Sequence, residues 1–173
     1  MDKSMIEHQP PFLITRPSGL PFQEEILEDL TRAKLTVVTE LMIYDWKTFA
    51  RKLYYDKFGD REAGVGLQSG AEAWLDGTAI LFGNRAKVLL FEQEKKILSP
   101  PESSALLNKL LCFKFAFRAK KKQDKERIIV TCKRDEVYYR VFFDYIHTTD
   151  PDIGRLQQEW SWLLQEAKLA FHV

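Results

Sequence analysis

The sequence predicts a single α/β domain, and three observations support this prediction. Apolar runs rich in β-branched residues alternate with segments of helical periodicity, which is typical of α/β proteins. The chain has 173 residues, a length within the range of one domain. Its composition, with 45% hydrophobic and 29% charged residues, is that of an ordinary globular protein.

The first half of the chain predicts two strands and two helices. Residues 1–11 are polar and end in two prolines, so we expect a loose tail. Residues 12–15 (FLIT) form a short apolar run that suits a buried strand. The helix that follows has apolar residues at helical spacing: Phe22, Ile26, Leu27, Leu30 and Ala33. Residues 35–43 are rich in β-branched side chains and predict a second strand, after which Asp45 can cap a second helix.

The second half is expected to add a third strand, two helices and a pair of strands. Residues 78–82 (TAILF) predict the third strand, and residues 85–96 predict a helix that stops at the following Ser-Pro-Pro. Two β-rich runs within residues 127–143 indicate a hairpin or one bent strand pair. The last helix is expected to begin with Asp150 as its cap and Pro151 at its first position.

Charge and cysteine content exclude several classes of protein. The net charge of +1 gives no general reason to expect a nucleic acid or a membrane as partner. The two cysteines are far apart, so they indicate neither a disulfide framework nor a zinc site, and we expect no metal held by protein side chains. No apolar run is long enough for a secretion signal or for the roughly 20 residues of a membrane span. We therefore expect a cytoplasmic protein without a membrane partner.

His147 is the strongest candidate for a chemically reactive side chain. It follows the apolar run VFFDYI and precedes the start of the last helix. A residue in this position faces backbone N–H groups and the positive end of a helix dipole, which together favour a phosphate group. Histidine also acts as a base or nucleophile near neutral pH. The alternative is a structural or surface histidine.

Residues 146–150 (IHTTD) resemble the signature of nucleoside diphosphate kinases, in which the active-site histidine is followed by a small residue, Ser or Thr, and Asp. The resemblance implies that His147 accepts the γ-phosphate of a nucleoside triphosphate and passes it to a diphosphate. It also implies a phosphate-binding role for Thr149. Glu159 lies one residue beyond the position where the family has a glutamate that orients the histidine.

The resemblance extends to the first half of the chain. Residues 12–18 (FLITRPS) are similar to the family's first strand, which ends in Lys-Pro-Asp, so Arg16 stands where the family has a phosphate-binding lysine. Tyr54 and Asp56 resemble a tyrosine and an aspartate of the second helix, and the resemblance places the tyrosine near the histidine and the phosphates. Residues 66–80 look like the family's segment before its third strand. Asp144 is the nearest counterpart of the family's asparagine before the histidine.

We expect the fold of this family, a ferredoxin-like βαββαβ core spanning residues 12–173. It would have a four-stranded, mostly antiparallel sheet with helices on one face, plus an insertion around residues 100–135. An active enzyme would require Mg²⁺ and ATP or another nucleoside triphosphate. The family's two phosphate-clamping arginines have no counterpart in frame, which favours a second hypothesis, a catalytically impaired module that binds nucleotide or a protein partner, including a further copy of itself. A third is nucleic-acid binding through the basic, aromatic residues 114–125, with a solvated basic loop as its alternative.

Overall fold

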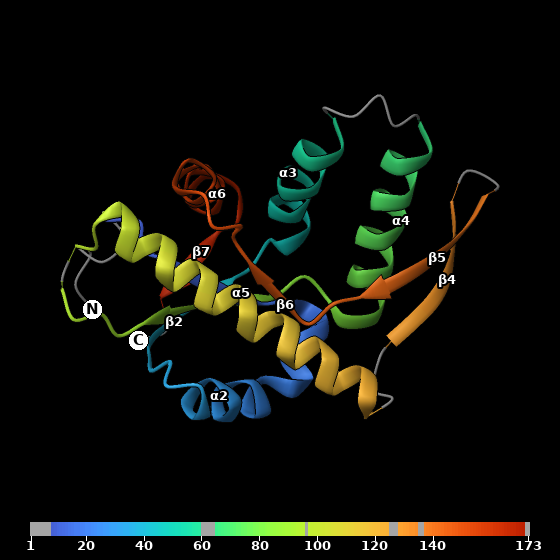
Figure 1. The fold of residues 1–173 in the computed structure, drawn as a ribbon. Coiled ribbons are helices and arrows are strands. Elements are labelled where there is room, and N and C mark those ends of the chain that lie inside the picture. Colours follow the sequence, from blue (N-terminus) through green and yellow to red (C-terminus); the bar gives the residue numbers. More distant parts are fainter. Residues whose placement is uncertain (1–7, 60–64, 96, 125–127, 135–136, 172–173) are drawn as a thin grey trace.

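The computed structural model describes residues 8–59, 65–95, 97–124, 128–134 and 137–171. It is an α+β fold in which helices pack on an open antiparallel sheet (Figure 1). The sheet has five strands in the order β6-β1-β3-β2-β7, and a two-stranded hairpin, β4-β5, stands apart from it. The expected number of four strands is therefore wrong.

The five strands of the sheet are short and mostly buried. They are β1 (Phe12–Thr15), β2 (Val37–Ile43), β3 (Ala86–Phe91), β6 (Ile146–Thr148) and β7 (Leu169–Phe171). Each pairs with its neighbours in antiparallel register, so β1 and β2 run parallel to each other on either side of β3. The fifth strand, β7, pairs with Leu41–Ile43 at the end of β2. With three residues it is too short to leave a periodic pattern in the sequence.

Helices cover both faces of the sheet, which corrects the expectation of helices on one face. On one face lie α3 (Trp46–Gly59), α4 (Val65–Phe82) and α6 (Ile153–Glu166). On the other lie α2 (Gln23–Arg32), which follows the short 3-10 helix η1 (Pro17–Phe22), and the long α5 (Pro100–Gln123). Figure 1 shows α5 running across the sheet above α2. The sheet has an apolar core on each face, and alternate residues of a strand pack into one or the other. In β1, Ile14 packs with α3 and α6, and Leu13 packs with α2 and α5.

The middle of the chain differs most from the prediction. Residues 78–82, expected to be a strand, form the end of α4, where Ile80 is 82% exposed. Residues 86–91, expected to be helical, form β3 instead. A short apolar run fits either a buried strand or a helix, and β3 is buried on both faces, which removes the alternation that identifies a strand.

The helix starts were predicted in part. Asp45 caps α3 as expected, accepting a hydrogen bond from the Thr48 N–H at 3.2 Å. The last helix is capped by Asp152 and not by Asp150, with the Arg155 N–H donating to Asp152 at 2.6 Å. Ser99, read as part of a helix stop, is the cap of α5 and forms a capping box with Glu102.

The segment predicted as an insertion contains α5 and β4 (Ile128–Arg134), and β5 (Val137–Phe143) completes the hairpin. The hairpin extends beside α4 (Figure 1).

At the other end of the chain, Pro10 belongs to the segment predicted as a tail, and it is buried. Its carbonyl accepts a hydrogen bond of 2.8 Å from the Trp160 indole.

Candidate functional site

His147 lies in the middle of the edge strand β6, directly opposite Ile14 of β1. The expectation that it faces the N-terminus of the last helix is therefore wrong, because α6 begins only at Ile153 and is capped by Asp152. Because opposite residues of an antiparallel pair point to the same face, its side chain enters the layer formed by α3 and α6. The residue is 2% exposed. Its neighbours Ile146 and Thr148 point to the opposite face, so the strand presents only its histidine to this layer.

Glu159 of α6 holds the imidazole of His147. The distance from His147 Nε2 to Glu159 Oε2 is 2.9 Å, and the carboxylate is 1% exposed. The charged carboxylate can only accept a hydrogen bond, so the proton of the neutral ring stays on Nε2 and the lone pair is on Nδ1. Among the described residues, Nδ1 has no hydrogen-bond partner. The pair therefore presents a nucleophilic nitrogen in a fixed orientation.

Glu159 receives two further hydrogen bonds, which keep it charged. Thr149 Oγ1 donates to Oε2 at 2.7 Å, and Arg155 Nε donates to Oε1 at 2.9 Å. Burial by itself raises the pKa of Glu159, but His147, Thr149 and Arg155 together bring it down to about 2. Arg155 is itself held by the Leu53 carbonyl of α3 at 3.2 Å. The orienting carboxylate is thus a stable anion at neutral pH.

His147 is held in its neutral form. Burial lowers the pKa of the imidazole below its ordinary value, and this effect exceeds the opposing influence of the Glu159 carboxylate. The positive charges of Arg16 and Lys114 lower it further. A neutral imidazole is the form that acts as a nucleophile, so the environment favours nucleophilic chemistry at neutral pH.

Arg16 reaches the site from the end of β1, where a turn fixes its backbone. Its N–H donates to the Tyr145 carbonyl at 2.9 Å, and its own carbonyl accepts from the Gly19 N–H at 2.8 Å. Gly19 passes so close to the other chain segment that an added Cβ would lie 2.2 Å from the Tyr145 oxygen. The turn and residues 144–145 are therefore held as one unit next to His147.

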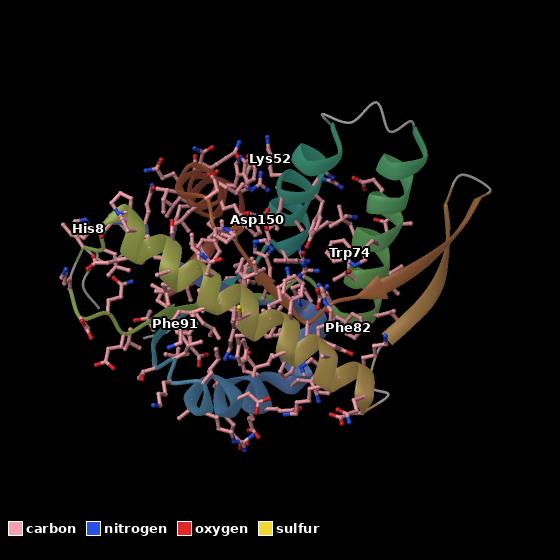
Figure 2. The ribbon with its side chains drawn as sticks, viewed as in Figure 1. His8, Lys52, Trp74, Phe82, Phe91 and Asp150 are labelled. Atoms are coloured by element: carbon pink, nitrogen blue, oxygen red, sulfur yellow. The ribbon has the colours of Figure 1, made fainter. Side chains whose placement is uncertain are left out.

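The guanidinium of Arg16 lies between two aromatic rings. Its central carbon is 5.4 Å from the ring centre of Tyr54 and 5.6 Å from that of Trp74. Trp74, labelled in Figure 2, extends from α4 toward α3, which carries Tyr54. Arg16 is only 7% exposed, and among the described residues it has no ion pair with a carboxylate. A buried guanidinium without a carboxylate is an open site for an anion.

The Tyr54 hydroxyl is another donor without a partner. It is buried and forms no hydrogen bond within the described residues, although the Arg16 guanidinium lies close to its ring. Burial raises the pKa of the phenol above its ordinary value, and the Arg16 charge opposes this only in part. The hydroxyl therefore keeps its proton and can donate it to a ligand oxygen.

Asp144 and two cations of α5 form the other side of the site. Asp144 Oδ2 pairs with Arg118, and Oδ1 accepts from the Tyr145 N–H at 2.9 Å. Burial raises the pKa of Asp144, but Arg16, Arg118 and Lys114 outweigh this and lower it. Helix α5 thus contributes positive charge that the sequence reasoning could not place.

The structure brings together the site residues predicted from the sequence. Hydrogen bonds link His147, Thr149 and Glu159, in spite of the extra residue in the spacing, and ring contacts link Arg16 to Tyr54. The side chain of Asp56 lies outside the described residues. Sequence reasoning missed Arg155, which the four-residue spacing to Glu159 could have revealed as a helix pair. It also missed Trp74 as an aromatic neighbour of Arg16.

The basic segment of residues 114–125 is helical up to Gln123, and several of its cations are paired within the chain. Lys120 contacts Glu25 at 2.6 Å and Asp29 at 2.7 Å, and Lys121 is buried against Glu25. These ion pairs join α5 to α2. They give the nucleic-acid hypothesis no support, because paired cations are less available to phosphates.

No family model, no curated protein and no solved structure matches the chain. Within the described ranges, no group of three or more His, Cys, Asp or Glu side chains is arranged to hold a metal ion. No helix in the described part of the chain has both the length and the apolar character needed to cross a membrane.

Proposed function

We propose that the chain is a nucleoside diphosphate kinase-like protein of the cytoplasm, which transfers a phosphoryl group through His147. One observation carries this proposal: a buried, neutral imidazole is oriented by Glu159 at Nε2 and leaves Nδ1 open within the electrostatic field of Arg16. Nucleophilic transfer requires these three elements: a lone pair on a fixed atom, a partner for the developing ring charge, and a cation for the phosphate.

The proposed reaction has two steps that mirror each other. In the first, the Nδ1 lone pair attacks the γ-phosphorus of a nucleoside triphosphate. The Nδ1–P bond forms while the bond to the bridging oxygen breaks, and the diphosphate leaves with that electron pair. In the second, a terminal oxygen of another diphosphate attacks the same phosphorus, and the electron pair of the Nδ1–P bond returns to the ring. Glu159 stabilises the positive charge that the ring carries while it is phosphorylated.

Three other residues have supporting roles in this proposal. Arg16 binds the transferred phosphate, and the unpartnered Tyr54 hydroxyl donates to one of its oxygens. The hydroxyl of Thr149, which was expected to bind phosphate, donates a hydrogen bond to Glu159. We therefore assign it the positioning of Glu159 instead. Mg²⁺ would neutralise the nucleotide phosphates, and we propose that it arrives bound to them, since it is commonly held through substrate phosphates.

The strand order supports the ferredoxin-like part of the proposal. In the order β6-β1-β3-β2, two strand-helix-strand units interlock, with α2 connecting β1 to β2 and α5 connecting β3 to β6. Strand β7 then adds a fifth strand at the β2 edge. We propose that these four strands and two helices form a ferredoxin-like core, and that α3, α4, α6 and the hairpin are additions to it.

A second function, binding without transfer, is favoured by one observation. His147 is 2% exposed, and the neighbouring Arg118 is occupied by Asp144, so a nucleotide must displace protein contacts to reach Nδ1. A module that binds nucleotide at this site and does not transfer phosphate fits these contacts.

Incubation with γ-labelled ATP and Mg²⁺ separates the two functions. We expect an acid-labile label on the wild-type protein and on His8→Gln, which removes an exposed histidine outside the site. We expect none on His147→Gln. If the folded wild-type protein acquires no label, the transfer proposal is wrong. Thermal stabilisation by nucleotide in that case would establish the binding module.

A further inference from the structure

The side chain of Asp144 is a fixed anion inside the candidate phosphate site. It is 8% exposed, and both carboxylate oxygens are engaged, Oδ2 by Arg118 and Oδ1 by the Tyr145 N–H. Its main-chain carbonyl accepts a hydrogen bond of 2.6 Å from Ser18 Oγ. Asp144, three residues before His147 in the sequence, therefore cannot move away without breaking several contacts.

The cations around Asp144 retain unused hydrogen-bonding capacity. The Nε atoms of Arg16 and Arg118 are both buried without an acceptor, and so is the Tyr54 hydroxyl. One carboxylate has too few oxygens for two guanidinium groups, each with five N–H donors. A ligand with more anionic oxygens than a carboxylate satisfies donors that Asp144 leaves open.

We propose that Asp144 is a built-in competitor for the phosphate site: it holds Arg118 in the ligand-free protein, and the phosphates of a polyphosphate ligand take Arg118 over. Arg118 is then a phosphate-binding residue supplied by α5, and the ligand class is a chain of at least two phosphates. This inference rests on the proposed function, because that function places a phosphate next to His147.

Arg118 can change partner at moderate cost. Its side chain is 36% exposed, whereas that of Asp144 is 8% exposed, so the arginine is the member of the pair that a ligand can reach from solvent. Its guanidinium also lies 5.5 Å from the ring of Phe115, another residue of α5. A polyphosphate offers bidentate geometry and a larger negative charge than the carboxylate, which favours the exchange.

Tripolyphosphate without Mg²⁺ is the probe, and calorimetry on the full chain is the measurement. We expect Asp144→Asn to bind the probe about tenfold more tightly than wild type, since one charge-assisted competitor is removed. We expect Arg118→Gln to bind it about tenfold more weakly. In the Arg118→Gln background the gain from Asp144→Asn should shrink to about threefold or less, because only the effect of the Asp144 charge on the nearby Arg16 is then removed. Lys120→Gln removes a cation of the same helix that pairs with α2, and it should bind like wild type.

The inference is overturned by equal or weaker binding of Asp144→Asn, by an equal gain with and without Arg118, or by no binding to either protein. If Asp144→Asn does not fold, the wild-type protein still provides the test. The side-chain Nε–H signal of Arg118 in an ¹⁵N-arginine spectrum, identified by its loss in Arg118→Gln, must then move with tripolyphosphate, and a constant signal refutes the exchange. The binding pattern is independent of label transfer, so failure of the catalytic proposal and failure of this one are distinguishable.

Discussion

Replacing Glu159 with glutamine tests the central pair of the site. In the wild-type protein three donors converge on the two carboxylate oxygens: His147 Nε2 at 2.9 Å, Thr149 Oγ1 at 2.7 Å and Arg155 Nε at 2.9 Å. A glutamine has one oxygen and one NH₂ group. If its oxygen faces Arg155, the NH₂ donates to His147 Nε2 and forces the proton to Nδ1. If its oxygen faces His147, the NH₂ meets the Arg155 donor.

The expected losses follow from this conflict of donors. Removing one partner of a buried charge pair costs about 3–5 kcal/mol, so the free energy of unfolding in urea should fall by that amount. The wrong tautomer withdraws the Nδ1 lone pair, and the labelling rate should fall about 10²- to 10⁴-fold. Glu166→Gln makes the same chemical change at the end of the same helix, outside the site, and should leave both quantities within error.

Three measurements check this prediction. Urea denaturation gives the free energy, the labelling assay gives the rate, and the ¹⁵N shifts of the His147 ring report which nitrogen carries the proton. The reasoning is refuted if Glu159→Gln keeps the wild-type tautomer and labels at the wild-type rate.

Three further predictions concern the surroundings of the site. Gly19→Ala puts a Cβ 2.2 Å from the Tyr145 oxygen and should lower the free energy of unfolding in urea by about 3 kcal/mol; a change below about 0.5 kcal/mol would contradict the close approach. Burial lowers the pKa of His147 in the folded protein. As the pH drops below about 6.5, this imidazole is therefore protonated in the unfolded chain before it is protonated in the folded protein. Stability should therefore fall from pH 7 to pH 5 by up to about 1.4 kcal/mol per pH unit, and His147→Gln should show a shallower decline in the same chemical denaturation series. Trp160→Phe removes the indole that donates to Pro10 and should cost about 1–3 kcal/mol by thermal denaturation, with an unchanged melting temperature as the opposing result.

The candidate site was more accessible to sequence reasoning than the fold around it. His147 could be singled out because histidine is reactive near neutral pH and because residues 146–150 form a recognisable local motif. Its expected place at a helix start was wrong, since it lies inside β6 and α6 begins at Ile153. Glu159 lies in α6, which starts at Ile153, and it contacts His147 in spite of the one-residue difference in spacing. The secondary structure of residues 78–91 was misread, since a continuous apolar run has no period to separate a strand from a helix.

Other features depend on contacts that no local pattern encodes. The Arg118–Asp144 pair joins a helix to a segment 26 residues away, and the Arg16 contact with Trp74 depends on the packing of α4 against α3. The capping box of Ser99 and Glu102 was visible in the sequence and was misread, because the prolines next to it were taken as a helix stop. They occupy the first turn of α5, where a proline loses no hydrogen bond.

The turn that pins Arg16 to residues 144–145 also constrains when the site can form. Ser18 and Asp144 are 126 residues apart in sequence, yet they share a hydrogen bond, and β1 lies between β3 and β6 in the sheet. Contacts of such high sequence separation are slow to close, because the intervening chain must be ordered first. During synthesis, β1 can pair with β3 first, because its other partner, β6, follows β3 in the chain. The histidine and its arginine are therefore expected to meet only after β6 has been made and has joined β1.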